Sequence, residues 1–236
     1  MPPSEERYAA MRWNSPLSED HASRLLQRLA VSSDGLVVDL GCGWGELLVR
    51  AVADTGAKAI GVDTDEQLLQ RGRDNAKQRG LADRVTFVAG DAAGWQDQCE
   101  RAICIGAAHA WGGTTNALRR LHEVVKPGGR LLLGDGCWER PPTAAAAAIF
   151  DDVRPLGEIV RTVISTGWRL LHLSTADQRE WDEFESTWLA GPPEWLLANP
   201  DLPESAGERA RLDSRLLEYV ESYRGVLGFC YLVLAR

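Results

Sequence analysis

The residues of this chain best suited to bind a ligand lie in and just after a short apolar run, 36–40. Asp39 is the one charged residue of that run, and a helical pattern begins soon afterwards at Glu46. Three glycines at alternate positions lie between the run and the helix, at Gly41, Gly43 and Gly45. Glycines let the backbone turn sharply and approach a ligand closely, because they carry no side chain. The stretch therefore predicts a buried strand, a ligand-binding turn and a helix whose free N–H groups face the ligand.

The glycine spacing separates two classes of nucleotide-binding turn. The dinucleotide pattern G-x-G-x-x-G needs its third glycine where this chain has Glu46. A carboxylate there would sit badly beside a pyrophosphate bound at the helix N-terminus. Asp39, two residues before the first glycine, could instead accept a hydrogen bond or pair with a cationic group. The turn thus suits a ligand without phosphates, and a nicotinamide-dependent oxidoreductase is the less favoured alternative.

This arrangement resembles motif I of the class I S-adenosylmethionine (SAM)-dependent methyltransferases, in which an acid precedes three alternate glycines. Here the acid is Asp39. Further signals of the family follow in the expected order within residues 30–136. They are strands at 59–62, 85–89 and 103–106 and a Lys-Pro-Gly-Gly turn at 126–129 that leads into a strand at 130–134. One glycine triplet is weak evidence, whereas an ordered series at the family's spacing indicates both the fold and the cofactor.

The resemblance also implies which residues contact the cofactor. Asp63 ends the second strand, at the position where an acid reaches the ribose hydroxyls, although an acid there could also cap the next helix. Asp91 follows the third strand, where the family's acid contacts the adenine amino group. The full set assigned to SAM is Asp39, Gly41, Cys42, Gly43, Gly45, Asp63, Thr64, Asp91, Ala92 and Gly106.

The expected architecture is an α/β fold with a seven-stranded, mostly parallel sheet and helices on both faces, as in Rossmann-like methyltransferases. We expect one domain over the 236 residues, with a final strand at 229–234 inserted antiparallel. Residues 1–30 would form a helical N-terminal segment, and residues 30–136 the cofactor-binding half. Residues 137–236 would build the substrate side, including a lid-like insertion before the last strands.

The acceptor side offers one candidate for acid–base chemistry, His109, in the loop after the fourth strand. A neutral imidazole there could take a proton from the acceptor as the methyl group is transferred, or it could simply shape the loop. The loop lacks the Asn/Asp-Pro-Pro-Tyr/Phe pattern of enzymes that methylate nucleobase or glutamine nitrogens. Candidate walls of the acceptor pocket are Trp13, Trp111, Trp138, Trp188 and Trp195. Trp13 is equally compatible with a lid over the cofactor and with a ring that fills the edge of the sheet.

The composition of the chain argues against several classes of binding partner. With 34 acidic and 26 basic residues the chain has a formal charge of −8, which would repel a nucleic acid backbone. No apolar run approaches the roughly 20 residues that span a membrane. The five cysteines are scattered and the four histidines dispersed, which indicates reduced thiols, a cytoplasmic location and no metal site.

The sequence therefore predicts an enzyme that transfers a methyl group from SAM to an oxygen or nitrogen atom of a small molecule. A SAM-binding sensor or partner protein without turnover is the alternative from another class, because motif I reports binding only. The acceptor's identity and the oligomeric state are left open.

Overall fold

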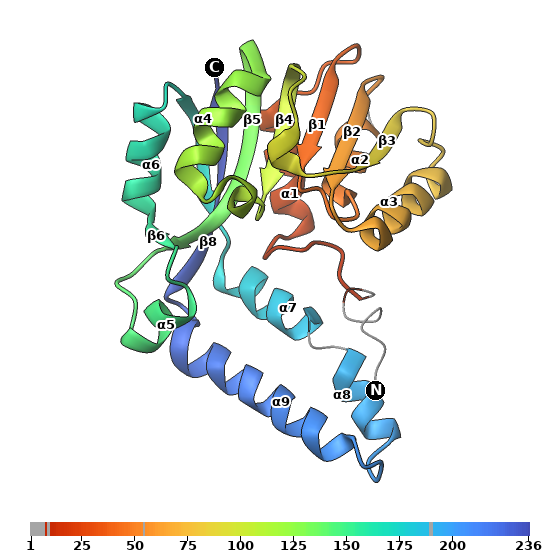
Figure 1. Ribbon diagram of the computed structural model, residues 1–236, viewed down its shortest axis with the longest axis vertical. Helices are drawn as coiled ribbons and strands as arrows, with labels where there is room; N and C mark the ends of the chain where they lie inside the picture. Colours follow the sequence, from red (N-terminus) through yellow and green to blue (C-terminus); the bar gives the residue numbers. More distant parts are fainter. Residues whose placement is uncertain (1–7, 9, 54, 189–190) are drawn as a thin grey trace.

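A twisted sheet forms the centre of the computed structural model, which describes residue 8 and residues 10–53, 55–188 and 191–236 (Figure 1). Its strands are β1 (Leu36–Leu40), β2 (Lys58–Asp63), β3 (Val85–Ala89), β4 (Cys99–Ile105), β5 (Val125–Trp138), β6 (Arg154–Pro155), β7 (Arg169–Thr175) and β8 (Leu227–Ala235). They are arranged in the order β3-β2-β1-β4-β5-β8-β7, and the short β6 pairs with β5. β8 is antiparallel to both of its neighbours, and the other pairs are parallel. The predicted seven-stranded, mostly parallel sheet is confirmed, with β6 as a two-residue addition.

Helices cover both faces of this sheet. They are α1 (Glu19–Leu29), α2 (Glu46–Ala53), α3 (Glu66–Gln78), α4 (Thr114–Val124), α5 (Ala144–Ile149), α6 (Leu156–Ser165), α7 (Gln178–Trp188), α8 (Gly191–Ala198) and α9 (Ser205–Glu218). Short turns of 3-10 helix, η2 (Ala92–Gly94) and η3 (Ala108–Trp111), follow β3 and β4, and a π turn, η4 (Tyr219–Tyr223), extends α9. No helix within the described ranges is both long enough and apolar enough to cross a membrane.

Side chains along each strand point alternately to the two faces of the sheet, and this creates two hydrophobic cores. Val37 of β1 packs into a cluster with apolar residues of α1, α2 and α3, whereas its neighbour Val38 packs into a second cluster with residues of α4 and α6. The same division recurs in β5, where Leu132 joins the first cluster and Leu133 the second. Successive strand side chains point to opposite faces, so strands that are buried on both sides read as continuous apolar runs. Covering both faces leaves the carboxyl ends of the parallel strands free for ligands.

Helix termini agree closely with the local sequence signals. The Ser18 side chain accepts a hydrogen bond from the His21 backbone N–H and caps α1. The Asp65 carboxylate accepts from the backbone N–H groups of Gln67 and Leu68 and caps α3. Asp65 therefore fills the capping role that was the alternative for Asp63, which leaves Asp63 available for another function.

Two expectations about element boundaries were wrong. β4 begins at Cys99 rather than Ile103, because its polar first residues pair with β5, Cys99 lying opposite Val125. β5 is correspondingly longer than the strand expected at 130–134. The insertion of α7, α8 and α9 lies before the last strand, between β7 and β8, so the two antiparallel partners are separated by about 50 residues of chain.

Candidate functional site

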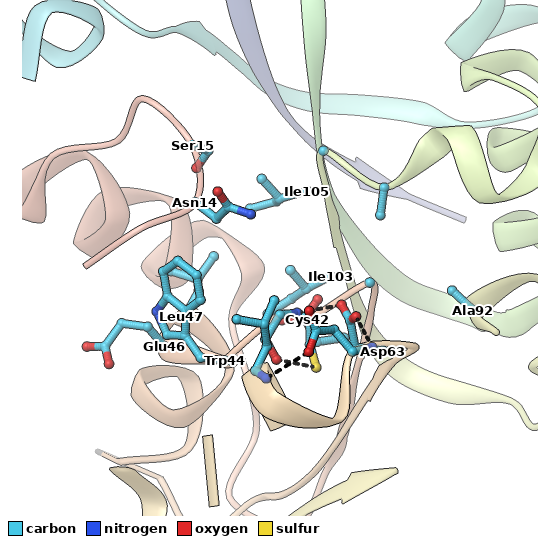
Figure 2. Close-up of a pocket in the computed structure, with 18 of the residues that line it drawn as sticks. Asn14, Ser15, Cys42, Trp44, Glu46, Leu47, Asp63, Ala92, Ile103 and Ile105 are labelled. Atoms are coloured by element: carbon cyan, nitrogen blue, oxygen red, sulfur yellow. Dashed lines mark hydrogen bonds between the residues drawn. The ribbon is translucent and has the colours of Figure 1, made fainter. Parts of the chain in front are cut away.

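A cavity of about 560 Å³ lies at the carboxyl ends of the parallel strands. It brings together all ten residues assigned to the cofactor and two of those assigned to the acceptor side, His109 and Trp13. Figure 2 shows Asn14, Ser15 and Ile105 on one side of the space, with Cys42 and Asp63 on the other. In open α/β sheets ligands bind at this edge, because the strand-to-helix turns leave a crevice there.

The glycine turn has the conformation that its sequence predicts. Gly41, Gly43 and Gly45 have φ angles of 80°, 55° and 61°, a left-handed region that side chains disfavour. The backbone N–H groups of Gly41 and Cys42 both donate to the Val62 carbonyl, at 2.8 and 3.0 Å, which ties the turn to β2. A Cβ on Gly41 would lie 2.2 Å from the Ala107 side chain, so the loop after β4 is packed directly against the turn.

Asp63 organises the turn from the end of β2. Its Oδ2 accepts from the Gly43 backbone N–H at 2.8 Å, and its Oδ1 accepts from the Asp65 N–H at 3.0 Å. Thr64, between the two acids, is exposed at the cavity wall. The carboxylate thus holds the second glycine of the turn while it lines the cavity, which is the place predicted for a ribose-binding acid.

The Asp39 carboxyl is the most strongly perturbed acid of the cavity. Asp39 is buried, and within the described ranges no group donates a hydrogen bond to its side chain. Burial, with a smaller contribution from the nearby Asp63 charge, raises its pKa to about 8. A buried carboxyl without a donor favours a cationic partner, and the open side of Asp39 faces the cavity.

The acid that follows the third strand also lines the cavity. The Asp91 carboxylate accepts from the Ala93 backbone N–H at 2.9 Å and caps η2, and its side chain is exposed beside the buried Ala92. Gly106 directly follows β4 and has a φ of 68°, and its N–H donates to the Gly134 carbonyl of β5 at 2.8 Å. Both positions line the cavity, so four successive strand ends meet around one space.

The segment before α1 forms the far wall of the cavity. Trp13, Asn14 and Ser15 line the space directly. The segment is fixed at both ends: the Trp44 indole N–H donates to the Arg12 carbonyl at 2.9 Å, and the Tyr231 hydroxyl donates to the Pro16 carbonyl at 2.9 Å, with Ser15 Oγ 3.2 Å from the same hydroxyl. The structure thus places α1 against the sheet and the residues before it at the wall of the cavity.

Sequence reasoning missed the residues that hold this wall in place. Arg71 of α3 donates to the Tyr8 and Met11 carbonyls, both at 2.6 Å, and its guanidinium lies 4.2 Å from the centre of the Trp44 ring. Trp44 is buried and lines the cavity. Its position between two glycines of the turn was an available signal, whereas nothing local in the sequence marks Arg71 as a partner of residues about 60 positions away.

His109 lies at the cavity rim. It belongs to η3, its side chain is exposed, and its ring makes no hydrogen bond with any described residue. The expected alternative, a ring held by backbone groups to shape the loop, has no such bond to support it. His109 is therefore free to accept a hydrogen bond from a ligand.

Four of the five tryptophans expected around an acceptor lie outside this cavity's lining. Trp138 is buried in the sheet core against Phe150, and Trp111 packs beside the second core cluster. Trp188 of α7 lies under the Arg215 guanidinium of α9, 5.2 Å from its ring centre. Trp195 belongs to α8, which packs on α9 below the sheet (Figure 1). Of these five tryptophans, Trp13 is the one that lines the space next to the cofactor-binding turn.

The charges of the cavity fit SAM, a ligand with a cationic sulfonium and an ammonium group. Arg12 is the one Lys or Arg among the described lining residues, against five carboxylates. These acids are Asp39, Glu46, Asp63, Asp65 and Asp91. The Glu46 charge is already neutralised by Arg50 at 2.7 Å and Arg79 at 2.6 Å, so Asp39 and Asp63 carry the preference for a cation. The described part of the chain contains no group of three side chains suited to a metal ion.

Comparison with known proteins agrees with this site. Residues 37–129 match a family described as a methyltransferase domain. YjhP of Escherichia coli K12 is 30% identical over 92% of this chain and 91% of its own, and its crystal structure superposes with a TM-score of 0.86. A SAM-dependent methyltransferase from Geobacter sulfurreducens, solved in complex with S-adenosyl-L-homocysteine, is 30% identical over 97% of this chain and 95% of its own, with a TM-score of 0.87.

A relative whose name includes its methyl acceptor matches a smaller part of this chain. The 27-O-demethylrifamycin SV methyltransferase of Amycolatopsis mediterranei is 29% identical over 67% of this chain and 60% of its own. Neither this relative nor the Geobacter structure supports a nicotinamide-dependent oxidoreductase. The fold, the glycine turn and the comparisons agree: the chain belongs to the class I SAM-dependent methyltransferases, enzymes whose cofactor is SAM.

Proposed function

We propose that this methyltransferase acts on an oxygen or nitrogen atom of a small molecule. The observation that carries the proposal is the far wall of the cavity, where Trp13, Asn14 and Ser15 stand opposite the glycine turn. Hydrogen bonds from Trp44 and Tyr231 hold that wall in place, so it covers part of the space next to the turn and narrows the approach of a macromolecular surface. A partly covered space of this size limits water and positions two small reactants, which together supply much of a transfer rate.

On the cofactor side, each acid has a separate task. SAM supplies an electrophilic methyl group on a sulfonium. Asp39 would pair with a cationic group of the ligand, Asp63 would accept hydrogen bonds from the ribose hydroxyls while it holds Gly43, and Asp91 would receive the adenine amino group. Gly41, Gly43 and Gly45 let the backbone approach the ligand within contact distance.

Two observations support a small acceptor. The Amycolatopsis relative is named for 27-O-demethylrifamycin SV, a small molecule with an oxygen acceptor. The chain's formal charge of −8 and the acidic cavity both oppose a nucleic acid substrate. All five cysteines are free, which fits the cytoplasmic location that we infer.

We assign the acid–base role to His109, because its ring makes no hydrogen bond with any described residue and lines the cavity. A neutral imidazole could take a proton from an acceptor hydroxyl or ammonium group as methyl transfer proceeds. The test is His109→Asn, which retains hydrogen bonding but removes the base. We expect kcat with tritium-labelled SAM and a competent small-molecule extract to fall by about 100-fold, with SAM affinity unchanged.

The outcome separates the two roles of this residue. A kcat within a few-fold of the unmodified enzyme, with the acidic limb of its pH profile unmoved, would make His109 structural. A failure of the unmodified enzyme to label any small molecule, while it binds SAM, would overturn the proposed small-molecule function itself.

A further inference from the structure

A carboxyl near the end of β5 lies beside the segment that carries His109. β4 and β5 are parallel neighbours in the sheet (Figure 1), with Ile105 paired to Gly134. Asp135 directly follows Gly134, and the His109 loop, residues 106–113, directly follows Ile105. Asp135 is half-buried and is not among the residues that line the cofactor cavity. Its carboxyl therefore lies next to the start of the loop without reaching the cofactor space.

β5 holds both ends of the His109 loop. At the start of the loop the Gly106 N–H donates to the Gly134 carbonyl at 2.8 Å. Just past its end the hydroxyl of Thr114, the first residue of α4, donates to Asp135 Oδ2 at 2.5 Å. Asp135 Oδ1 accepts from the Gly136 backbone N–H at 2.9 Å, so both oxygens of the carboxylate are fixed in direction. The carboxylate thus anchors the far end of the loop to the strand.

The backbone around His109 is fixed, whereas its ring can meet a ligand. Ala108 is buried, and its carbonyl accepts from the Gly113 N–H at 3.1 Å. The His109 carbonyl accepts from the Gly112 N–H at 2.9 Å. The ring is exposed, lines the cavity and makes no hydrogen bond with any described residue. The place of the imidazole therefore depends on the backbone of the loop, which Asp135 anchors.

The charges of Asp135 and His109 also interact. Burial raises the pKa of the Asp135 carboxyl, and its two hydrogen bonds oppose that rise. A protonated His109 ring opposes the rise as well, so the two side chains lie within the range of electrostatic attraction. This attraction is mutual, because a carboxylate that is stabilised by an imidazolium stabilises that imidazolium in return.

Other acids face the loop from neighbouring elements. Asp152 precedes β6 and repels the carboxylate of β5. Asp91 caps η2, which packs against η3, and Asp39 of β1 lines the same cavity as the loop. α4 also packs against η3, and its first turn, residues 114–117, has no charged side chain. Among these acids, Asp135 is the one whose carboxylate is hydrogen-bonded to the residue that ends the loop.

We propose that Asp135 is a positioning residue for methyl transfer: it anchors the His109 loop, and its negative charge stabilises the imidazolium that forms when His109 takes a proton from the acceptor. This inference rests on the acid–base role proposed for His109 and deepens it. The acceptor's O–H or N–H proton passes to the imidazole, and the acceptor's electron pair forms the bond to the methyl carbon. The carbon–sulfur bond breaks with its electron pair passing to sulfur, and the imidazolium later releases its proton to water. Asp135 itself exchanges no proton.

The first test is Asp135→Asn, which removes the charge while it retains the shape and an oxygen that can accept from Thr114. We expect kcat, measured with labelled SAM and a small-molecule extract that the unmodified enzyme methylates, to fall by about tenfold. The acidic limb of the pH profile should move to lower pH by about 0.5–1 unit, because the protonated ring has lost a favourable charge. SAM affinity should be unchanged, since Asp135 does not line the cofactor cavity.

A double-substitution cycle shows whether Asp135 acts through His109. In the His109→Asn background, Asp135→Asn should lower kcat by less than about twofold, because the ring whose charge and position it serves is absent. The matched control is Asp97→Asn, which removes an exposed carboxylate just before the start of β4, the opposite end of that strand from the loop. It should change neither kcat nor the pH profile.

Thr114→Val separates the anchor from the charge. It removes the hydroxyl that joins Asp135 to α4 and keeps the carboxylate, so kcat should fall several-fold while the acidic limb stays in place. This variant also tests the inference if Asp135→Asn fails to fold, which circular dichroism and the melting temperature would reveal. An unchanged kcat in Thr114→Val would overturn the anchoring role.

Three further results would overturn the inference: a kcat of Asp135→Asn within twofold of the unmodified enzyme, an unmoved acidic limb, or an equal loss of kcat from this substitution in the presence and absence of His109. Each would leave the proposed role of His109 standing if His109→Asn alone lowers kcat as expected. A kcat that His109→Asn leaves unchanged would instead overturn the proposed acid–base role and this inference with it.

Discussion

The two halves of the ligand-binding region are built in different ways. On the cofactor side the key contacts are close in sequence, such as the hydrogen bond from Gly43 to Asp63, 20 residues apart. On the acceptor side they join distant parts of the chain, with Ser18 bonded to Glu180 across 162 residues and Tyr231 to Pro16 across 215. A site made of local turns can be specified by a short sequence motif. The shape of a site made of long-range contacts depends instead on which distant segments pack together.

The largest loss of SAM affinity is expected from a substitution that fills the space beside the glycine turn. Gly41→Ala places a Cβ 2.2 Å from the Ala107 side chain at a φ of 80°. The clash and the left-handed conformation together cost about 2–5 kcal/mol. We expect SAM affinity, measured by isothermal titration, to fall by at least about 30-fold. The melting temperature should fall by roughly 5–10 °C.

Gly80→Ala is the matched control for that experiment. Gly80 follows α3 with a φ of 69°, but a Cβ there would meet no atom within 4 Å, and the residue lies outside the cavity. It should lose a little stability from the backbone conformation and no SAM affinity. Equal losses of SAM affinity in the two variants would mean that the glycine turn is not shaped for the ligand.

The same contrast explains what the sequence could predict. β1 and β3 have the bounds expected for them and α2 begins at Glu46 as expected, because each coincides with an apolar run or borders a glycine. The acids at the strand ends meet in one cavity, since parallel strands deliver their carboxyl ends to one edge. Asp39 was recognised from its place before the first glycine.

The acceptor side could not be predicted in this way. An insertion rich in tryptophan makes Trp188 and Trp195 candidates for the wall of a pocket, yet the aromatic residue of α7 that lines a cavity is Phe184. Which face of an amphipathic helix meets a cavity depends on where the helix docks, and the docking of α7 is set by contacts such as Glu180 with His21 of α1. The periodicity of a sequence predicts that a helix has an apolar face, but it does not predict which part of the protein that face contacts.

A smaller effect, dependent on pH, should follow from the buried acid of the cofactor half. Asp39→Asn removes the carboxylate that would pair with a cationic ligand group but keeps the side chain's shape. We expect SAM affinity to fall by about tenfold at a pH of about 8, the value of a charge-assisted hydrogen bond. In the unmodified enzyme the affinity should weaken as the pH is lowered below about 8, because the pKa of Asp39 is about 8 and its protonated form cannot pair with a cation. The variant should lack this pH dependence.

The stability of the ligand-free protein should depend on pH in the opposite direction from SAM affinity, because it should decrease as the pH rises. Asp39 binds its proton more tightly in the folded state, with a pKa of about 8, than in the unfolded chain, whose value is 3.8. Its contribution to stability is therefore complete below a pH of about 4 and is lost progressively as the pH rises to about 8. Asp39→Asn should accordingly raise the melting temperature at alkaline pH by at least about 2 °C and change it little in acid. A variant that is less stable at alkaline pH would contradict the unpartnered state of this carboxyl.

The smallest effect is expected in the insertion, where two aromatic residues of one helix should behave differently. Trp188 lies under the Arg215 guanidinium and lines neither the cofactor cavity nor a separate cavity of about 350 Å³ between the N-terminal segment and α7, whereas Phe184 lines the latter. Trp188→Ala loses a cation–π contact worth about 0.5–1 kcal/mol, so the melting temperature should fall by about 2–4 °C while the KM values for SAM and acceptor stay within about twofold. Phe184→Ala should raise the acceptor's KM and leave that of SAM unchanged, since only one of the two ligands would contact its ring. If Trp188→Ala instead raises the acceptor's KM selectively, α7 contacts the acceptor along more of its length than that separate cavity indicates. Acceptor binding would then involve both Trp188 and Phe184, and α7 could not be divided into residues that pack and residues that bind.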